Sequence, residues 1–391
     1  MRSVLIASAV RTPIGQFLGG LSSQTATQLG SIVIREAVRR TGIPPDQVDE
    51  VLMGNVLSAG LGQAPARQVA IGGGLPDRVP CTTINKVCGS GLKAVMMGAQ
   101  AIALGDADIV VAGGMESMSQ APYLLERARV GYRAGHAQLT DSLIKDGLWD
   151  VYNNFHMGAA AEICAEDYRM TRAELDDFAI ESYRRAQAAQ EAGDFNREIV
   201  PVPVRHGEDL LLFSEDQEPK RADFDKIRTL KPAFDPEGKI TAGNASPLSD
   251  GASAVVLISE AASTQWRVPA RAAIDGYTAT AKAPAQFTTA PADAIRQLLE
   301  KREQHVSDID LFEINEAFAA STISVMRELG IDSKQLNLRG GAIALGHPIG
   351  ASGARILTTL LHIMEDRLLQ NGIASLCIGG GEALALYIER K

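Results

Sequence analysis

The chain alternates short, almost wholly apolar segments with longer segments of small and apolar residues. Residues 4–10 (VLIASAV) and 108–114 (DIVVAGG) are nearly continuously apolar, which predicts strands that are covered on both faces. Residues 90–104 carry the small and apolar side chains of a buried helix, with Ser90 at its start and Gly105 after its end. Alternating strands and helices predict an α/β protein built in layers.

Parts of this pattern occur twice. Three segments of the first part of the chain have a counterpart in the last part, in the same order and at nearly the same separation. The paired segments are VDEVLMG (48–54) with IDLFEIN (309–315), CGSG (88–91) with GASG (350–353), and IVVAGGME (109–116) with SLCIGGGE (375–382). We infer a duplication. Two such halves side by side would bring their equivalent turns into one site.

The middle of the chain differs from both halves. Residues 118–248 are richer in aromatic side chains, and they include a polar helix with a possible capping box at Thr171 and Glu174 and a possible end at Gly193. We interpret them as an inserted loop domain that covers the site; a structural or oligomerisation insert is the alternative. The predicted halves are residues 1–117, to which the chain returns at 249–268, and residues 269–391.

Charge and cysteine content exclude several classes of protein. A formal net charge of −9 argues against a general nucleic-acid-binding protein, which usually has a basic domain. The four cysteines form no CxxC pair, so we expect no zinc or redox motif.

The start of the chain runs into an apolar strand rather than a signal peptide, and no apolar run of about 18 residues predicts a membrane span. We therefore expect a cytoplasmic protein that does not enter a membrane.

Cys88 is the first candidate for chemistry. It lies where an extended segment meets the predicted helix, and a helix N-terminus favours the reactive thiolate over the thiol. Gly89 and Gly91 would let a ligand or a second loop approach closely. A small buried cysteine with no chemical role is the alternative.

Three further candidates lie in the second half. His347 stands between Gly346 and Pro348 in a glycine-rich turn, and its ordinary pKa suits it to taking a proton from a thiol. Cys377 ends an apolar strand before three glycines, whose N–H groups could hold an oxyanion; a buried strand cysteine is the alternative. Asn315 follows a strand, where it could cap the next helix or hold a catalytic water.

Four segments together resemble the signature set of the thiolase family. They are NKVCGSGLKAV (85–95), NEAFA (315–319), GGAIALGHPIGASG (340–353) and CIGGG (377–381), and further similarity extends over nearly the whole chain. The resemblance implies a duplicated five-layer α-β-α-β-α core with an inserted loop domain. It also implies a homo-oligomer, either a dimer or a tetramer.

The resemblance also implies roles for the candidate residues. Cys88 would be acylated by an acyl-CoA, His347 would activate it, and Cys377 would remove the α-proton of the second substrate. Asn315, through a water, would form one oxyanion hole with His347, and the N–H groups of Cys88 and Gly379 would form the other. No metal or redox cofactor is implied, because coenzyme A serves as substrate and product.

Within the family, the chain resembles the short-chain type. The implied reaction is the reversible Claisen condensation of two acetyl-CoA molecules to acetoacetyl-CoA and coenzyme A. A 3-ketoacyl-CoA thiolase that degrades longer fatty acids is the nearest rival. A decarboxylating ketoacyl synthase is disfavoured by Cys377, and a non-catalytic relative would have lost at least one of these groups.

The resemblance further implies contacts with coenzyme A. Ser246 would bond the pantetheine chain, and a mostly apolar set would line the arm and the acyl pocket: Leu148, His156, Met157, Phe234, Ala242 and Phe318. Met157 would limit the acyl chain. We expect a local basic patch to contact the phosphates, a solvated loop being the alternative; its members are Lys220, Arg221, Lys226, Arg228 and Lys231. Pro247, Glu382 and Ala383 depart from the family pattern.

Overall fold

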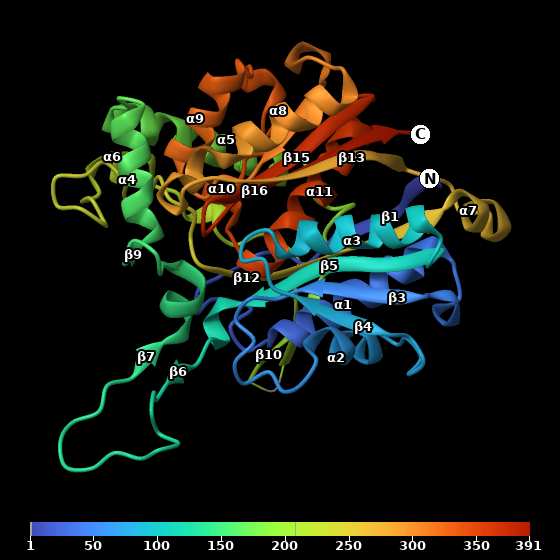
Figure 1. The fold of residues 1–391 in the computed structure, drawn as a ribbon, viewed down its shortest axis with the longest axis horizontal. Helices are drawn as coiled ribbons and strands as arrows, with labels where there is room; N and C mark the ends of the chain where they lie inside the picture. Colours follow the sequence, from blue (N-terminus) through green and yellow to red (C-terminus); the bar gives the residue numbers. More distant parts are fainter. Residues whose placement is uncertain (1, 208) are drawn as a thin grey trace.

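The computed structural model describes residues 2–207 and 209–391. Its centre is a ten-stranded sheet in which each half of the chain contributes its own run of strands, and the short strand β2 (Gly15–Gln16) pairs with β12 (Ser249–Ser259) beside these runs (Figure 1). The first run is β1 (Val4–Arg11), β12, β5 (Ile109–Ser117), β3 (Glu50–Gly54) and β4 (Cys81–Ile84). The second is β13 (Ala272–Ala281), β16 (Glu382–Arg390), β15 (Asn371–Ile378) and β14 (Leu311–Ile314).

The two runs have the same topology. In the first, β3 pairs in parallel with β5, which pairs antiparallel with β12, which pairs antiparallel with β1. In the second, β14, β15, β16 and β13 follow the same sequence of directions. A short antiparallel contact between β1 and β13 joins the runs. The repeated topology confirms the duplication predicted from the paired segments.

Two helices fill the space between the two runs. α3 (Ser90–Leu104) and α11 (Ile349–Asp366) pack against each other and share one apolar cluster with both runs of strands. Glycines allow this contact, because a Cβ atom on Gly91 would lie 2.9 Å from the backbone nitrogen of Ala354. α11 is buried along almost its whole length.

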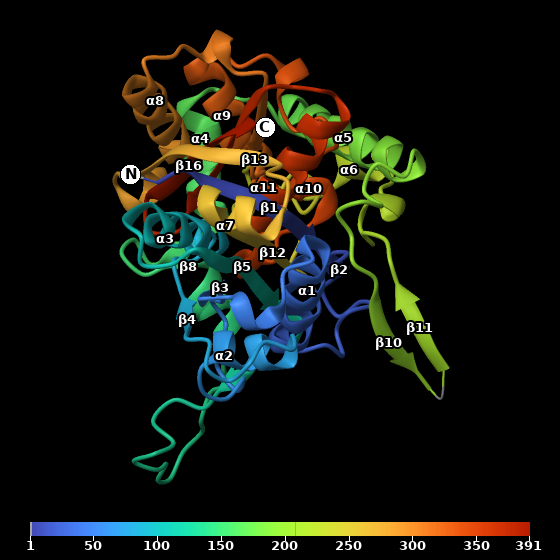
Figure 2. The same ribbon diagram turned by 90° about the vertical axis from the view of Figure 1, so that its right-hand side faces the viewer.

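Other helices cover the outer faces. α1 (Ala26–Thr41) and α2 (Pro65–Gly72) lie on the first run, and α8 (Ala290–Arg302) and α9 (Ala319–Leu329) lie on the second. The order of layers is therefore α-β-α-β-α, as expected (Figures 1 and 2).

The α3 region departs from one expectation. Residues 87–104 are long and apolar enough to span a membrane by length and composition, although we expected no such segment. More than half of this window is buried inside the protein, where α3 packs on α11 and β5. We therefore interpret it as a core helix.

The insertion packs mainly on the second half. Its helices are α4 (Met157–Asp167), α5 (Arg172–Glu191) and α6 (Phe224–Thr229), and α4 and α5 contact α9. The side chain of Thr171 caps α5, as predicted, but Glu174 bonds Arg327 instead of completing the capping box. Gly193, in the left-handed region at φ 74°, follows the end of α5.

Two parts of the insertion extend away from the body of the protein. One is the segment between β6 (Tyr123–Leu124) and β7 (Thr140–Asp141), and the other is the hairpin of β10 (Val202–His206) and β11 (Asp209–Phe213) (Figures 1 and 2). A third small pair, β8 (Trp149–Asp150) with β9 (Phe155–His156), leads into α4. The boundaries of the insertion, residues 118 and 248, stay a prediction from the sequence.

Candidate active site

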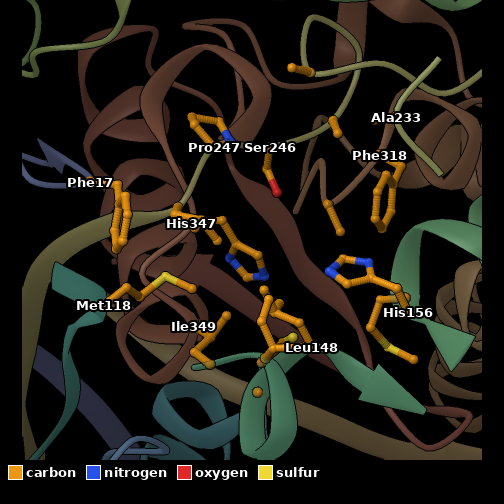
Figure 3. A pocket seen from close by; sticks show the side chains of 18 of the residues that line it. Phe17, Met118, Leu148, His156, Ala233, Ser246, Pro247, Phe318, His347 and Ile349 are labelled. Carbon is orange, nitrogen blue, oxygen red and sulfur yellow. The ribbon is translucent and has the colours of Figure 1, made fainter. Parts of the chain in front are cut away.

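A pocket of about 490 Å³ lies where the insertion meets both halves (Figure 3). Cys88 and His347 line it, and so do all eight residues expected to bind substrate: Leu148, His156, Met157, Arg221, Phe234, Ala242, Ser246 and Phe318. The structure thus brings together residues that are up to 259 positions apart in the printed sequence, from Cys88 to His347.

Cys88 lies in a tight turn between β4 and α3. Val87, the residue before it, has φ of 46°, a left-handed conformation that a β-branched residue rarely adopts. The turn is held by Ser90, whose hydroxyl accepts from the backbone N–H of Lys86 at 2.8 Å and donates to the carbonyl of Val87 at 2.6 Å. These bonds point the thiol of Cys88 into the pocket.

The pKa of Cys88 is opposite to the sequence-based expectation. Burial raises the pKa of its thiol to about 11, although the N–H groups of Gly379 and of Cys88 itself act in the opposite direction. α3 begins only at Ser90, so the prediction that the helix N-terminus makes Cys88 a thiolate is wrong: desolvation outweighs it. A base is therefore needed to activate the thiol.

His347 is arranged as that base. His347 comes shortly after α10 (Ala342–Leu345) in the chain, and its Nδ1 lies 2.6 Å from the hydroxyl oxygen of Ser352. The Ser352 hydroxyl donates its own proton to the carbonyl of Pro348 at 3.0 Å. In the contact between Ser352 and His347, Nδ1 is therefore the donor, and Nε2 of His347 carries a lone pair. Burial lowers the pKa of His347 to about 3, so the ring is neutral and able to accept a proton.

His347 Nε2 has no protein partner among the described residues. Its ring and that of His156 face one another across the pocket (Figure 3). The Nε2 nitrogen is thus a buried, unpartnered acceptor on a ring that lines the pocket.

Cys377 lies behind the pocket wall rather than on it. It is 1% exposed at the end of β15. Burial first, and then the nearby Cys88, raise its pKa above the ordinary thiol value. No positively charged group is among the causes of this shift, so no cation in the described part of the free protein offsets the desolvation of the Cys377 thiol.

Asn315 ends β14 without capping the next helix. α9 begins four residues later at Ala319, and the cap position is Phe318, so the capping alternative is wrong. The Asn315 amide is 1% exposed, and both its nitrogen and its oxygen lack a protein partner among the described residues. A buried amide in this state fits a role in holding a polar ligand or a water.

Gly379 begins the turn that follows β15. A Cβ atom here would lie 3.3 Å from the sulfur of Met157 and 3.6 Å from Val87. The turn continues through Gly380 and Gly381, with φ of 94° and 92°. The N–H groups of Gly379 and of Cys88 both lower the pKa of the Cys88 thiol. Two backbone donors therefore act on this sulfur atom.

Comparison with known proteins identifies the family. A family model described as "Thiolase, N-terminal domain" matches residues 4–261, and one described as "Thiolase, C-terminal domain" matches residues 268–390. The chain belongs to the thiolase family. Thiolases are acyltransferases, so the predicted fold and enzyme class are confirmed.

Several relatives match this thiolase over its full length. Proteins named acetyl-CoA acetyltransferase from Cupriavidus necator and Pseudomonas aeruginosa are each 51% identical to it, over 100% of both chains. The crystal structure of the Bacillus anthracis acetyl-CoA acetyltransferase superposes with a TM-score of 0.98 at 42% identity, covering 100% of this chain and 99% of that one. A thiolase from Ascaris suum, solved in complex with coenzyme A, superposes with a TM-score of 0.95 at 45% identity over 100% of both chains.

Aromatic rings form one wall of the pocket in this thiolase. His156 stacks on Phe234 with ring centroids 4.8 Å apart, and Phe318 meets Phe234 and Phe287 edge-on at 6.2 and 6.4 Å. Phe287 was missed by the sequence analysis, because it belongs to a short segment, Pro284–Thr289, that carries no motif. Its position beside Phe318 is visible only in the fold.

Only part of the expected basic patch reaches the pocket. Arg221 lines it, with Glu218 of the pocket wall 3.8 Å away. Lys220 and Arg228 do not line it; they pair with Glu215 and, at 2.6 Å, with Asp177. The sequence analysis also missed further lining residues that lie outside the four signature segments: Gln16, Phe17, Met118, Ile144 and Glu218. Ile349, within the segment 340–353, lines the pocket as well.

Proposed function

We propose that this thiolase is an acetyl-CoA C-acetyltransferase, which condenses two acetyl-CoA molecules to acetoacetyl-CoA and coenzyme A and catalyses the reverse thiolysis. The observation that carries the proposal is that Cys88 and His347 line one apolar pocket, while the N–H groups of Cys88 and Gly379 act on the Cys88 thiol. These are a nucleophile, its base and an oxyanion hole.

In the first half-reaction, the proton of Cys88 passes to Nε2 of His347 while the sulfur attacks the thioester carbonyl of acetyl-CoA. The N–H groups of Cys88 and Gly379 stabilise the negative oxygen that forms. The bond between the carbonyl carbon and the sulfur of coenzyme A then breaks, and the leaving sulfur takes up the proton of Cys377, which leaves Cys377 as a thiolate and His347 protonated. An acetyl group remains on Cys88.

In the second half-reaction, the thiolate of Cys377 removes a proton from the methyl carbon of a second acetyl-CoA. The enolate oxygen accepts hydrogen bonds from protonated His347 and from a water held by Asn315. The carbon attacks the acetyl group, the bond to Cys88 breaks, and the Cys88 sulfur takes back the proton from His347 as acetoacetyl-CoA forms. The raised pKa of Cys377 suits this step, because a thiolate of high pKa is the stronger base.

The short acyl chain is supported by the pocket and by the relatives. Met157 packs beside Gly379, close to the reacting sulfur, and the rings of Phe234, Phe287 and Phe318 close one wall. Two full-length relatives at 51% identity are named acetyl-CoA acetyltransferases. A relative from Staphylococcus aureus, 46% identical, is named a probable acetyl-CoA acyltransferase, which keeps a longer-chain 3-ketoacyl-CoA thiolase as the second candidate.

Thiolysis kinetics test the proposal and separate the two candidates. We expect fast cleavage of acetoacetyl-CoA by free coenzyme A and slower cleavage of 3-ketohexanoyl-CoA and longer substrates. Preference for the longer substrates would support the degradative thiolase. Inactivity of the wild type on all of them would contradict both candidates.

The proposal includes the setting of the enzyme. We propose a cytoplasmic homotetramer or dimer that acts in fatty-acid metabolism without a membrane, nucleic acid, metal or redox cofactor, since cysteine, histidine and backbone N–H groups supply the chemistry. A full-length relative from Gibberella zeae, 50% identical, is named as cytosolic. Exposed apolar side chains on the extended segment 123–139, such as Val130 and Leu139, support an oligomer, which sedimentation velocity would test.

A further inference from the structure

The two halves of the chain supply the two backbone donors that face Cys88. The nucleophile turn, residues 85–89, belongs to the first half, and the glycine turn, residues 378–382, belongs to the second. The N–H of Cys88 and the N–H of Gly379 both act on the Cys88 thiol. Two donors can stabilise one oxyanion only if the distance between them is fixed before the reaction.

Local bonds fix each turn internally. Ser90 holds Lys86 and Val87 in the nucleophile turn. In the glycine turn, Ile378 pairs with Glu382 as β15 passes into β16. None of these bonds joins one turn to the other, so they leave the relative position of the two donors open.

An ion pair makes the connection. The Nζ of Lys86 donates to Oε2 of Glu382. Among the described residues, this is the one side-chain hydrogen bond between the nucleophile turn and the glycine turn. The side chains are 23% and 38% exposed, so the pair is partly shielded from water and from salt.

Apolar contacts between the turns do not replace the pair. A Cβ atom on Gly379 would touch Val87, and one on Gly89 would collide with Ile378, so the turns are packed closely but without directional bonds. Val87 itself is held in the left-handed region at φ 46°, a conformation that persists only where the surroundings enforce it. The ion pair of Lys86 with Glu382 is a directional interaction next to Val87 that helps to hold this conformation.

We propose that Lys86 and Glu382 are positioning residues that fix the distance between the oxyanion donors of Cys88 and Gly379. The inference rests on the proposed function, because it assigns the pair a role in the same acyl transfer. Neither side chain lines the pocket, so the pair acts through the two turns rather than on the substrate. Glu382 is one of the residues by which this chain departs from the family pattern.

The test compares single variants with a charge exchange. Lys86→Met and Glu382→Gln each remove the tie, and the double variant Lys86→Glu with Glu382→Lys restores it with reversed charges. Lys93→Met on α3 and Glu389→Gln on β16 are matched controls, because neither side chain makes a described side-chain bond. The readouts are kcat and KM for acetoacetyl-CoA thiolysis, with thermal unfolding as a check on folding.

We expect each single variant to lower kcat about tenfold, which is less than the effect of losing a whole oxyanion donor, and to leave KM within about twofold of the wild type. The charge-exchange variant should recover most of kcat. A purely structural pair would not give this division between kcat and KM. Single variants that match the controls in kcat, or an exchange no better than the singles, would overturn the inference. An inactive wild type would instead overturn the proposed function, and this inference with it.

Discussion

Desolvation favours the protonated thiol at both cysteines of the site: Cys377 is buried, and Cys88 is half-buried at the pocket wall. Desolvation raises the pKa of Cys88 to about 11 and raises that of Cys377 as well. The same burial lowers the pKa of His347 to about 3 and so keeps its ring neutral. Burial thus prevents a spontaneous thiolate, and it provides a neutral base beside the thiol that is to be activated.

This arrangement predicts how Cys88 reacts with iodoacetamide as the pH changes. A thiol pKa near 11 means that the thiolate fraction, and with it the alkylation rate, continues to rise from pH 7 to pH 10. Alkylation kinetics of wild type against Cys88→Ser would isolate this thiol. A rate that levels off below pH 8, or that inflects at the ordinary histidine pKa, would contradict the burial argument.

Met157 is the single side chain that we expect to limit the acyl chain length. It is buried beside Gly379, so Met157→Ala opens space next to the reacting sulfur. We expect the ratio of kcat/KM for 3-ketohexanoyl-CoA to that for acetoacetyl-CoA to rise about tenfold, as for a few methylene groups in an apolar pocket.

Met118→Ala is the control for this change. Met118 also lines the pocket, but next to Phe17 and away from His156 (Figure 3). The chain-length ratio should stay near that of the wild type. Equal ratios for the two alanine variants would rule out a special role for Met157.

At the scale of elements, one buried carboxylate links the strand β5 to the turn that carries His347. Glu116 accepts four hydrogen bonds: from the Asn55 side chain at 2.9 Å, Val56 N–H at 3.1 Å, Leu57 N–H at 3.2 Å and Gly350 N–H at 3.0 Å. Each oxygen takes two of these bonds. The start of α11, three residues after His347, is thereby held against the first half.

Glu116→Gln should break this link. One carboxylate oxygen becomes an NH₂ group that faces two N–H donors, so we expect the free energy of unfolding to fall by about 2–3 kcal/mol. Burial raises the pKa of Glu116 to about 7, so urea unfolding at pH 9, where Glu116 is ionised, measures the loss, with Glu389→Gln as the control. An unchanged unfolding midpoint would show that these bonds do not stabilise the junction.

The sequence predicted those elements whose signal is local. The apolar runs and the glycine after Leu104 predicted β1, β5 and α3 because such signals lie within a few neighbouring residues. Of the two roles left open for Asn315, the helix cap is wrong, because Phe318 is extended and occupies the cap position of α9. Phe287 and the direction of the Cys88 pKa escaped prediction for a related reason: both depend on segments that only the fold brings together.

At the scale of the whole molecule, an acidic protein must bind a substrate with several phosphates. The chain has a net charge of −9, so a local positive group near the pocket has to offset the repulsion. Arg221 is the basic residue of the predicted patch that lines the pocket, while Arg228 is paired with Asp177. The structure therefore separates the two arginines of the predicted basic patch, because only Arg221 lines the pocket.

Charge reversal should separate the two arginines. We expect Arg221→Glu to raise the KM for coenzyme A about tenfold, the equivalent of one charged hydrogen bond, and Arg228→Glu to change it less than twofold. The difference should shrink as salt is added. Equal effects of the two variants would mean that the phosphates do not lie at Arg221.

The central claim, that Cys88 carries the acyl group, is tested most directly by mapping the covalent intermediate. The protein would be incubated with acetyl-CoA alone, quenched in acid, digested and analysed by mass spectrometry, alongside Cys88→Ser. The account predicts one acetyl group on the peptide that contains Cys88, and none on any peptide of the variant. Acetylation of Cys377 in place of Cys88, or no acetylation of the wild type, would contradict it.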